Sequence, residues 1–320
     1  MHYLVKVRNE TPLIINYSSG NYYRSLDYIP ASSILGALKA KKLSERGIWG
    51  GERKDDITLN LHLTDAYPST KDEQQLNIPS LATLYKERDE EEVYTDAVED
   101  IIATIEHRNK WGEKLLRLKK GPRHWSMKNG KAYHIPIRRT STNILKLDEQ
   151  LKTAYQVGEN GEKIGYLAHI DSIYPGQIFA FEATGEEEDI QFLSRALEEG
   201  VFIGSFRSKG YGLIKLVNKY YYASEKQEAN TSRYYILDFY GSVSYDYYAK
   251  ISHIVEKKFE IIGVERRKTF NYNEWETEYL IKTGSLLIVK SDRNLYKLEK
   301  ESIENNKGGK IVVNHPVHGL

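Results

Sequence analysis

Three glycines and two cations lie close together in the stretch GSFRSKGYG, which begins at Gly204 and ends at Gly212. Glycine permits a positive φ and leaves no Cβ in the way of a close ligand. Exposed backbone N–H groups beside Arg207 and Lys209 would suit a phosphate oxygen. The sequence therefore predicts a phosphate-binding loop, and the alternative is a tight strand-to-strand turn whose charges face water. The predicted contacts are Gly204, Arg207, Ser208, Lys209, Gly210, Tyr211 and Gly212.

The start of a predicted helix offers a second candidate anion site. In the stretch YIPASSILGALKAKKL, Pro30 ends an extended segment and Ser32 or Ser33 can cap a helix that runs to about Leu43. The first turn of a helix carries N–H groups without intrahelical partners at the positive end of the dipole. Ser32, Ser33 and Lys39 are therefore predicted anion contacts, and the alternative is a capped core helix without a ligand.

Residues 114–139 carry only basic charges, and the Asn129-Gly130 pair within them is typical of a β-hairpin turn. A basic hairpin with an aromatic side chain could lie along a phosphate backbone and stack a base. The alternative is a solvated face. The predicted contacts are Lys119, Lys120, Arg123, Trp125, Arg138 and Arg139.

The composition is that of a soluble globular protein. Of 320 residues, 40% are apolar and 28% are charged. Cysteine is absent, which excludes a disulfide, a zinc–thiolate site and a thiol nucleophile. The sequence has no run of about 18 apolar residues, which a membrane-spanning helix would need. The N-terminus lacks the apolar core of a signal peptide. We therefore expect a cytoplasmic protein. The formal net charge is +1, so nucleic-acid contacts must come from a local patch or from neighbouring subunits.

Hydrophobic periodicity predicts an α+β fold in which one order of elements occurs twice. The first cycle comprises a strand at 2–8, a helix at 32–43, strands at 59–63, 164–170 and 177–183, a helix at 186–200 and a strand at 213–217. This order matches a ferredoxin-like β-α-β-β-α-β unit. Residues 69–130 are interpreted as an insertion with a helix over 92–107, and residues 16–24 are interpreted as a loop.

A polar linker is predicted over 219–232, after a first module at 1–218. The second module, 233–320, is expected to contain a strand at 234–240, a helix at 245–259 and strands at 285–289 and 311–313. Both modules place Lys-Gly before an apolar strand that ends in Asn, at Asn218 and at Asn314. This similarity indicates an internal repeat.

Four segments follow one another in the chain: YIPASSILGALK from Tyr28, TDAYP from Thr64, RRTST from Arg138 and the glycine stretch from Gly204. In this order they resemble segments of RAMP-superfamily CRISPR-associated proteins. Ala31 stands where the family pattern has glycine. Trp275 with Thr283-Gly284-Ser285, and the closing Lys307–His318, are similar to the large two-domain subunit of type III-D complexes.

The resemblance implies a structural subunit of a type III effector ribonucleoprotein with two ferredoxin-like (RRM-like) modules. Such subunits act in antiviral defence and hold the repeat-derived 5′ handle of the CRISPR RNA. The implied partners are CRISPR RNA, the large signature subunit and the backbone RAMP subunit. No contact with a membrane is implied.

Enzymatic alternatives remain open from the sequence. Backbone subunits of the family cleave target RNA with an Asp before the first helix, and Asp27 is the acid in that loop. Relatives that process CRISPR RNA use a His as acid or base, for which the candidates are His124, His134 and His169. We expect neither a metal nor a cofactor, because the acidic runs lack the spacing of a metal nuclease. Binding without catalysis is the favoured interpretation, and a free-standing RRM-like module is a further alternative.

Overall fold

β1 (His2–Asn9) lies at the centre of the first sheet, and its apolar side chains alternate between the two sheet faces. Val5 and Val7 pack in the main core, whereas Leu4 and Lys6 are buried on the opposite face. The structure, a computed structural model, describes residues 1–19, 22–47, 59–72, 84–86, 93–96, 98–107, 125–128, 131–145, 155–157, 163–165, 167–221, 234–271, 274–305, 309–315 and 318.

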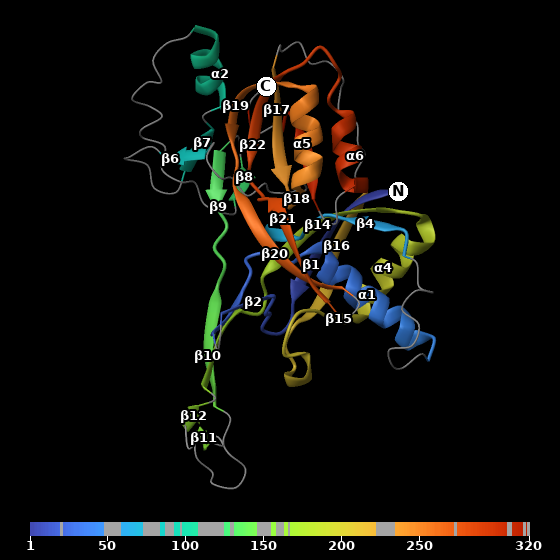
Figure 1. The fold of residues 1–320 in the computed structure, drawn as a ribbon. Helices are drawn as coiled ribbons and strands as arrows, with labels where there is room; N and C mark the ends of the chain where they lie inside the picture. Colours follow the sequence, from blue (N-terminus) through green and yellow to red (C-terminus); the bar gives the residue numbers. More distant parts are fainter. Residues whose placement is uncertain are drawn as a thin grey trace.

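The first sheet has the order β15-β16-β1-β14-β4, with β5 also paired to β14, and all its pairs are antiparallel. Its other strands are β4 (Leu61–Leu63), β5 (Tyr67–Ser69), β14 (Ile178–Gly185), β15 (Val201–Phe202) and β16 (Leu213–Tyr221). Two helices, α1 (Ala31–Glu45) and α4 (Glu187–Glu199), pack on the face that holds Val5 and Val7 (Figure 1). β16 is longer than predicted and continues through residues 219–221.

The second sheet has the order β19-β22-β17-β23, again with every pair antiparallel. Its elements are β17 (Tyr234–Tyr240), α5 (Tyr245–Ile254), β19 (Glu256–Ile261), β22 (Leu286–Lys290), α6 (Lys297–Asn305) and β23 (Lys310–Val313). The helix predicted over 245–259 is too long, because residues 256–261 pair with β22 as a strand. α6 was not predicted from the sequence.

A long hairpin interrupts the second module between β19 and β22. β20 (Val264–Asn271) pairs with β21 (Glu274–Ile281), and β21 also pairs with β18 (Val243–Ser244). The sequence analysis predicted no element here. The two modules nevertheless share one connectivity, in which the first and third core strands lie side by side at the centre of each sheet.

A narrow arm extends away from the first module (Figure 1). Its sheet has the order β10-β13-β3-β2, formed by β2 (Asn16–Ser19), β3 (Tyr22–Ser25), β10 (Arg139–Leu145) and β13 (Leu167–Ile173). The pair β11 (Tyr155–Val157) and β12 (Lys163–Gly165) lies at its far end. The prediction of a loop over 16–24 was wrong, because β2 and β3 form a hairpin and β3 pairs with the distant strand β13.

Segments of the predicted insertion over 69–130, together with residues 131–134, form a small sheet and a helix beside the second sheet (Figure 1). The sheet has the order β6-β7-β9-β8, from β6 (Leu84–Lys86), β7 (Val93–Asp96), β8 (Trp125–Lys128) and β9 (Lys131–His134). Pairing of Lys128 with Lys131 confirms the predicted hairpin. The helix α2 (Val98–His107) begins later than predicted, because residues 93–96 form β7.

The two modules contact each other through buried polar groups. The Tyr67 hydroxyl lies 3.0 Å from Thr283 Oγ1, and its ring packs edge-on against Tyr240. Lys310 Nζ donates a hydrogen bond to Glu182 Oε2 over 2.5 Å. Burial raises the pKa of Glu182, but the Lys310 ammonium and the hydrogen bond from His2 lower it more strongly, to about 2. The carboxylate therefore stays ionised within the contact.

Candidate nucleic-acid interface

The predicted phosphate loop connects β15 to β16 and contains one turn of 3-10 helix, η1 (Arg207–Lys209). Gly204 and Gly212 have φ values of 75° and 87°, and a Cβ at either position would overlap a carbonyl oxygen of the protein itself. Gly210 also has a positive φ, 82°, but faces open space. Two of the three glycines therefore serve close approach of the chain to itself, and one lies where a ligand could approach.

The backbone N–H groups of this loop are largely engaged by the protein. Ser205 N donates to Ile14 O over 2.9 Å, and Gly212 N donates to Pro12 O over 2.9 Å. Gly210 N donates to Arg207 O over 3.0 Å. The expectation that the N–H groups of Gly210 and Gly212 face a phosphate is therefore wrong, because the Gly210 N–H closes the turn and the Gly212 N–H bonds to the segment at Pro12.

The side chains of the loop present cations beside aromatic rings. Arg207, Ser208 and Lys209 are exposed, and Lys209 Nζ lies 5.5 Å from the centre of the Phe206 ring. Phe206 packs edge-on against Tyr23 of β3 at 5.4 Å and lies 6.2 Å from Tyr211. We call Tyr23, Phe206, Arg207, Lys209 and Tyr211 the loop patch. Phosphate oxygens and unstacked bases are the groups that such a patch can bind.

The start of α1 does not offer the predicted anion site. The helix begins at Ala31 rather than after a serine cap, and Ala31 N donates to the Asp65 carboxylate over 2.8 Å. Ser33 N donates to Pro30 O. An anion from the TDAYP segment thus already occupies this end of the helix, and the two segments pair directly between Ile29 and Ala66. Ser32 and Lys39 are exposed.

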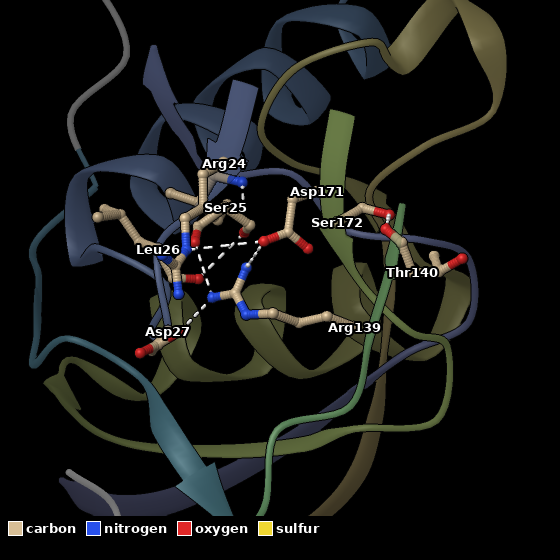
Figure 2. Close-up of polar contacts among 9 residues, drawn as sticks. Arg24, Ser25, Leu26, Asp27, Arg139, Thr140, Asp171 and Ser172 are labelled. Atoms are coloured by element: carbon tan, nitrogen blue, oxygen red, sulfur yellow. Dashed lines mark hydrogen bonds and ion pairs between the residues drawn. The ribbon is translucent and has the colours of Figure 1, made fainter. Parts of the chain in front are cut away.

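The predicted basic contacts divide into three groups. Lys119, Lys120 and Arg123 lie outside the described residues, and Trp125 begins β8. Arg138 is exposed. Arg139 lies within the protein and donates to Asp27, to Asp171 Oδ2 over 3.3 Å and to Ser25 O over 2.9 Å (Figure 2).

The ion pairs of Arg139 include Asp27, the candidate catalytic carboxylate. Asp27 is half-buried and forms an ion pair with Arg139, which also holds Asp171. Arg24 reaches the same Asp171 carboxylate at 3.6 Å (Figure 2). Asp27 thus links the loop before α1 to β10, which is a structural role. Among the histidines, His134 is exposed at the end of β9, His169 lies in β13 and His124 lies outside the described residues.

No group of three or more His, Asp or Glu side chains within the described ranges could hold a metal ion. No helix in the same ranges is long and apolar enough to cross a membrane.

The fold and the loop patch together define a mixed α and β protein with a candidate nucleic-acid interface. The family model of the RAMP superfamily matches residues 6–215 of this chain, so the chain belongs to that superfamily.

Two solved structures contain chains similar to this one. A chain in a cryo-EM structure of the type III-B Cmr-β complex bound to cognate target RNA has 16% sequence identity and a TM-score of 0.50, over 94% of this chain and 89% of that chain. A chain in the same type of complex with cognate target RNA and AMPPnP has 11% identity and a TM-score of 0.49, over 90% and 86%. No curated protein sequence matches significantly. At 16% identity, the first of these similarities establishes a shared fold.

Of the aromatic residues in the loop patch, Tyr211 was predicted from the sequence, whereas Tyr23 and Phe206 were not. Tyr23 lay in a segment that was interpreted as a loop, and Phe206 became relevant only when the chain brought it to β3. Phe206 has a φ of 59°, which is uncommon for a residue with a side chain. The available signal was the position of an aromatic residue inside a glycine-rich cationic stretch.

Proposed function

We propose that this chain is a non-catalytic CRISPR RNA-binding subunit of a type III effector ribonucleoprotein, built from two ferredoxin-like modules at 1–218 and 233–320. Membership of the RAMP superfamily and the shared strand order of the two sheets support this assignment. The observation that carries it is the loop patch, where Arg207 and Lys209 are exposed beside aromatic rings.

In this proposal the cations of the loop patch bind phosphates of the 5′ handle, and Tyr211 or Trp125 stacks an unpaired base. A net charge of +1 suits a subunit that shares the RNA with its neighbours. The proposed neighbours are the large signature subunit and the backbone RAMP subunit. The similarity to III-D subunits rests on Trp275, Thr283–Ser285 and the closing segment, and it stays a prediction.

The geometry favours binding over cleavage by Asp27. A carboxylate that acts on RNA must reach the reacting group. Asp27 instead pairs with Arg139, which anchors it to β10 and balances its charge. We therefore assign Asp27 to the framework of the arm.

The test is the Arg207→Ala/Lys209→Ala variant in the complex purified with its RNA. Removing two phosphate contacts should lower the RNA content and reduce the slope of log K against log salt by about 1.4 for single-stranded RNA. Filter binding at several salt concentrations measures the slope, and sequencing of the bound RNA shows whether the 5′ handle is retained.

A matched control removes the same charges elsewhere. Arg293 and Lys300 are exposed on the second module, so Arg293→Ala/Lys300→Ala should leave RNA content and salt slope as in the wild type. Equal behaviour of the two double variants would contradict the role of the loop patch. Purification without RNA or partner subunits would favour a free-standing module.

A further inference from the structure

The arm carries an aromatic stack on the sheet face opposite to the loop patch. Tyr22 and Tyr23 are neighbours in β3, so their side chains point to opposite faces of the sheet. Tyr23 packs against Phe206, whereas Tyr22 is 40% exposed and stacks on His169. The two rings lie 5.1 Å apart between centres with an interplanar angle of 4°.

A third side chain fixes this stack. Asn143 of β10 pairs with His169 of β13, and His169 Nδ1 lies 2.8 Å from Asn143 Oδ1. An amide oxygen only accepts hydrogen bonds, so His169 Nδ1 donates and the ring is held in one orientation. The amide NH2 of Asn143, which is exposed, remains able to donate to a ligand.

We infer that Tyr22, His169 and Asn143 form a platform for one unpaired nucleobase. An exposed aromatic face suits a base because every base has a π-face, and the exposed amide can donate to a base edge. The inference rests on the proposed function, because it assumes that RNA runs along this subunit.

The charges near the platform predict how it contributes to binding. The next residues on this face are Arg24 and Asp171, which pair with each other at 3.6 Å, and Arg139 pairs with Asp171 and Asp27. Two cations thus face two anions. The platform should therefore add affinity by stacking, with little dependence on salt, in contrast to the loop patch.

The experiment uses the purified complex and single-stranded RNA that carries 2-aminopurine at one position at a time. In the wild type, fluorescence should be quenched at one position by the platform. Tyr22→Leu should abolish that quenching and weaken binding about 5-fold to 150-fold, with an unchanged salt slope. Tyr22→Phe, which keeps the ring, should behave as the wild type.

Two measurements exclude a merely structural effect. Tyr279→Leu removes another exposed tyrosine, 62% exposed on β21, and should change neither binding nor quenching. Thermal unfolding of Tyr22→Leu should resemble that of Tyr279→Leu.

Unchanged quenching at every position in Tyr22→Leu would overturn the platform, while loss of RNA from Arg207→Ala/Lys209→Ala would still support the proposed function. Loss of a partner subunit from Tyr22→Leu, with RNA binding intact, would make the stack a protein contact and also overturn the inference.

Discussion

The two modules share a strand order but differ on the sheet face that points away from their helices. In the first module this face buries charges. Lys6 Nζ donates to the carbonyl oxygens of Thr70 and Lys71 over 2.8 and 3.0 Å, and Glu182 accepts from Lys310 of the second module. Each buried charge has hydrogen-bond partners, as burial requires.

In the second module the corresponding face buries Asp238 and Lys310, but it also carries an apolar cluster that the first module lacks there. Ile236, Leu286 and Ile288 lie there and form a cluster with Val98 and Ile101 of α2. This helix lies far from β17 and β22 in the sequence, so a distant segment of the chain completes the apolar cluster on this face of the second sheet. The modules are thus joined by the ion pair between Glu182 of the first sheet and Lys310 of the second, and by apolar burial of α2 against the second sheet.

The loops before the last strands show the same contrast. Lys209 is exposed beside Gly210 in the first module. In the second, a Cβ on Gly309 would overlap Ser242 O, and the Lys310 ammonium is buried against Glu182. Lys209, before β16, therefore faces solvent, whereas Lys310, the first residue of β23, faces the module contact. Lys307 and Gly308, the predicted counterparts of Lys209 and Gly210, lie outside the described residues.

The largest effect should come from breaking the ionic contact. Lys310→Met leaves Glu182 buried without its ammonium partner and should lower the free energy of unfolding by about 3–5 kcal/mol. Urea denaturation measures the change. Lys300→Met, whose side chain is 85% exposed, should cost less than about 0.5 kcal/mol.

A double variant separates the contribution of charge from the contribution of packing in the contact between Glu182 and Lys310. Replacing both charges by apolar side chains is often nearly neutral, so Glu182→Leu/Lys310→Met should recover most of the lost stability. If the double variant were less stable than Lys310→Met, the contact would depend on packing rather than on charge, and the contrast between the two modules would disappear.

Acid should weaken the same contact. The pKa of Glu182 is lowered from 4.5 to about 2, so its stabilising effect is complete above pH 4.5 and is lost as the pH falls toward 2. The loss should be about 3 kcal/mol, measured as the unfolding free energy between pH 6 and pH 2. Glu182→Gln should show a shallower decline than the wild type, and identical pH profiles would contradict this assignment.

The elements with strong local patterns were predictable from the sequence. The strand Tyr234–Tyr240 was predicted with the observed bounds, and the helix ending before Gly200 was predicted within one residue at each end. Errors occurred where a distant strand decided the conformation. Residues 16–24 have loop composition, yet residues 22–24 pair with β13 and residues 16–19 pair with β3. Residues 256–261 leave the predicted helix to pair with β22.

The exposure of the loop cations was predictable from the sequence, but the contacts of the other candidate residues were not, and the binding role of all of them stays a prediction. Arg207 and Lys209 are exposed, as the glycine stretch indicates. The sequence could not show that Asp65 occupies the start of α1 or that Arg139 binds Asp27, because each pair joins segments far apart in the chain. Such contacts appear only when the strands are in register.

The smallest effect in this comparison should come from the apolar contact of α2. Ile101 is fully buried, so Ile101→Ala should cost about 2–3 kcal/mol, in the lower part of the range for such truncations because a single surface helix can partly relax. Hydrogen exchange should accelerate in β17 and β22, which lie beneath α2, and should change little in β1 and β14. Ile254→Ala, at an exposed position of α5, serves as the control and should cost under about 1 kcal/mol. Unchanged protection of β17 and β22 in Ile101→Ala would mean that the second module does not depend on the insertion for its core.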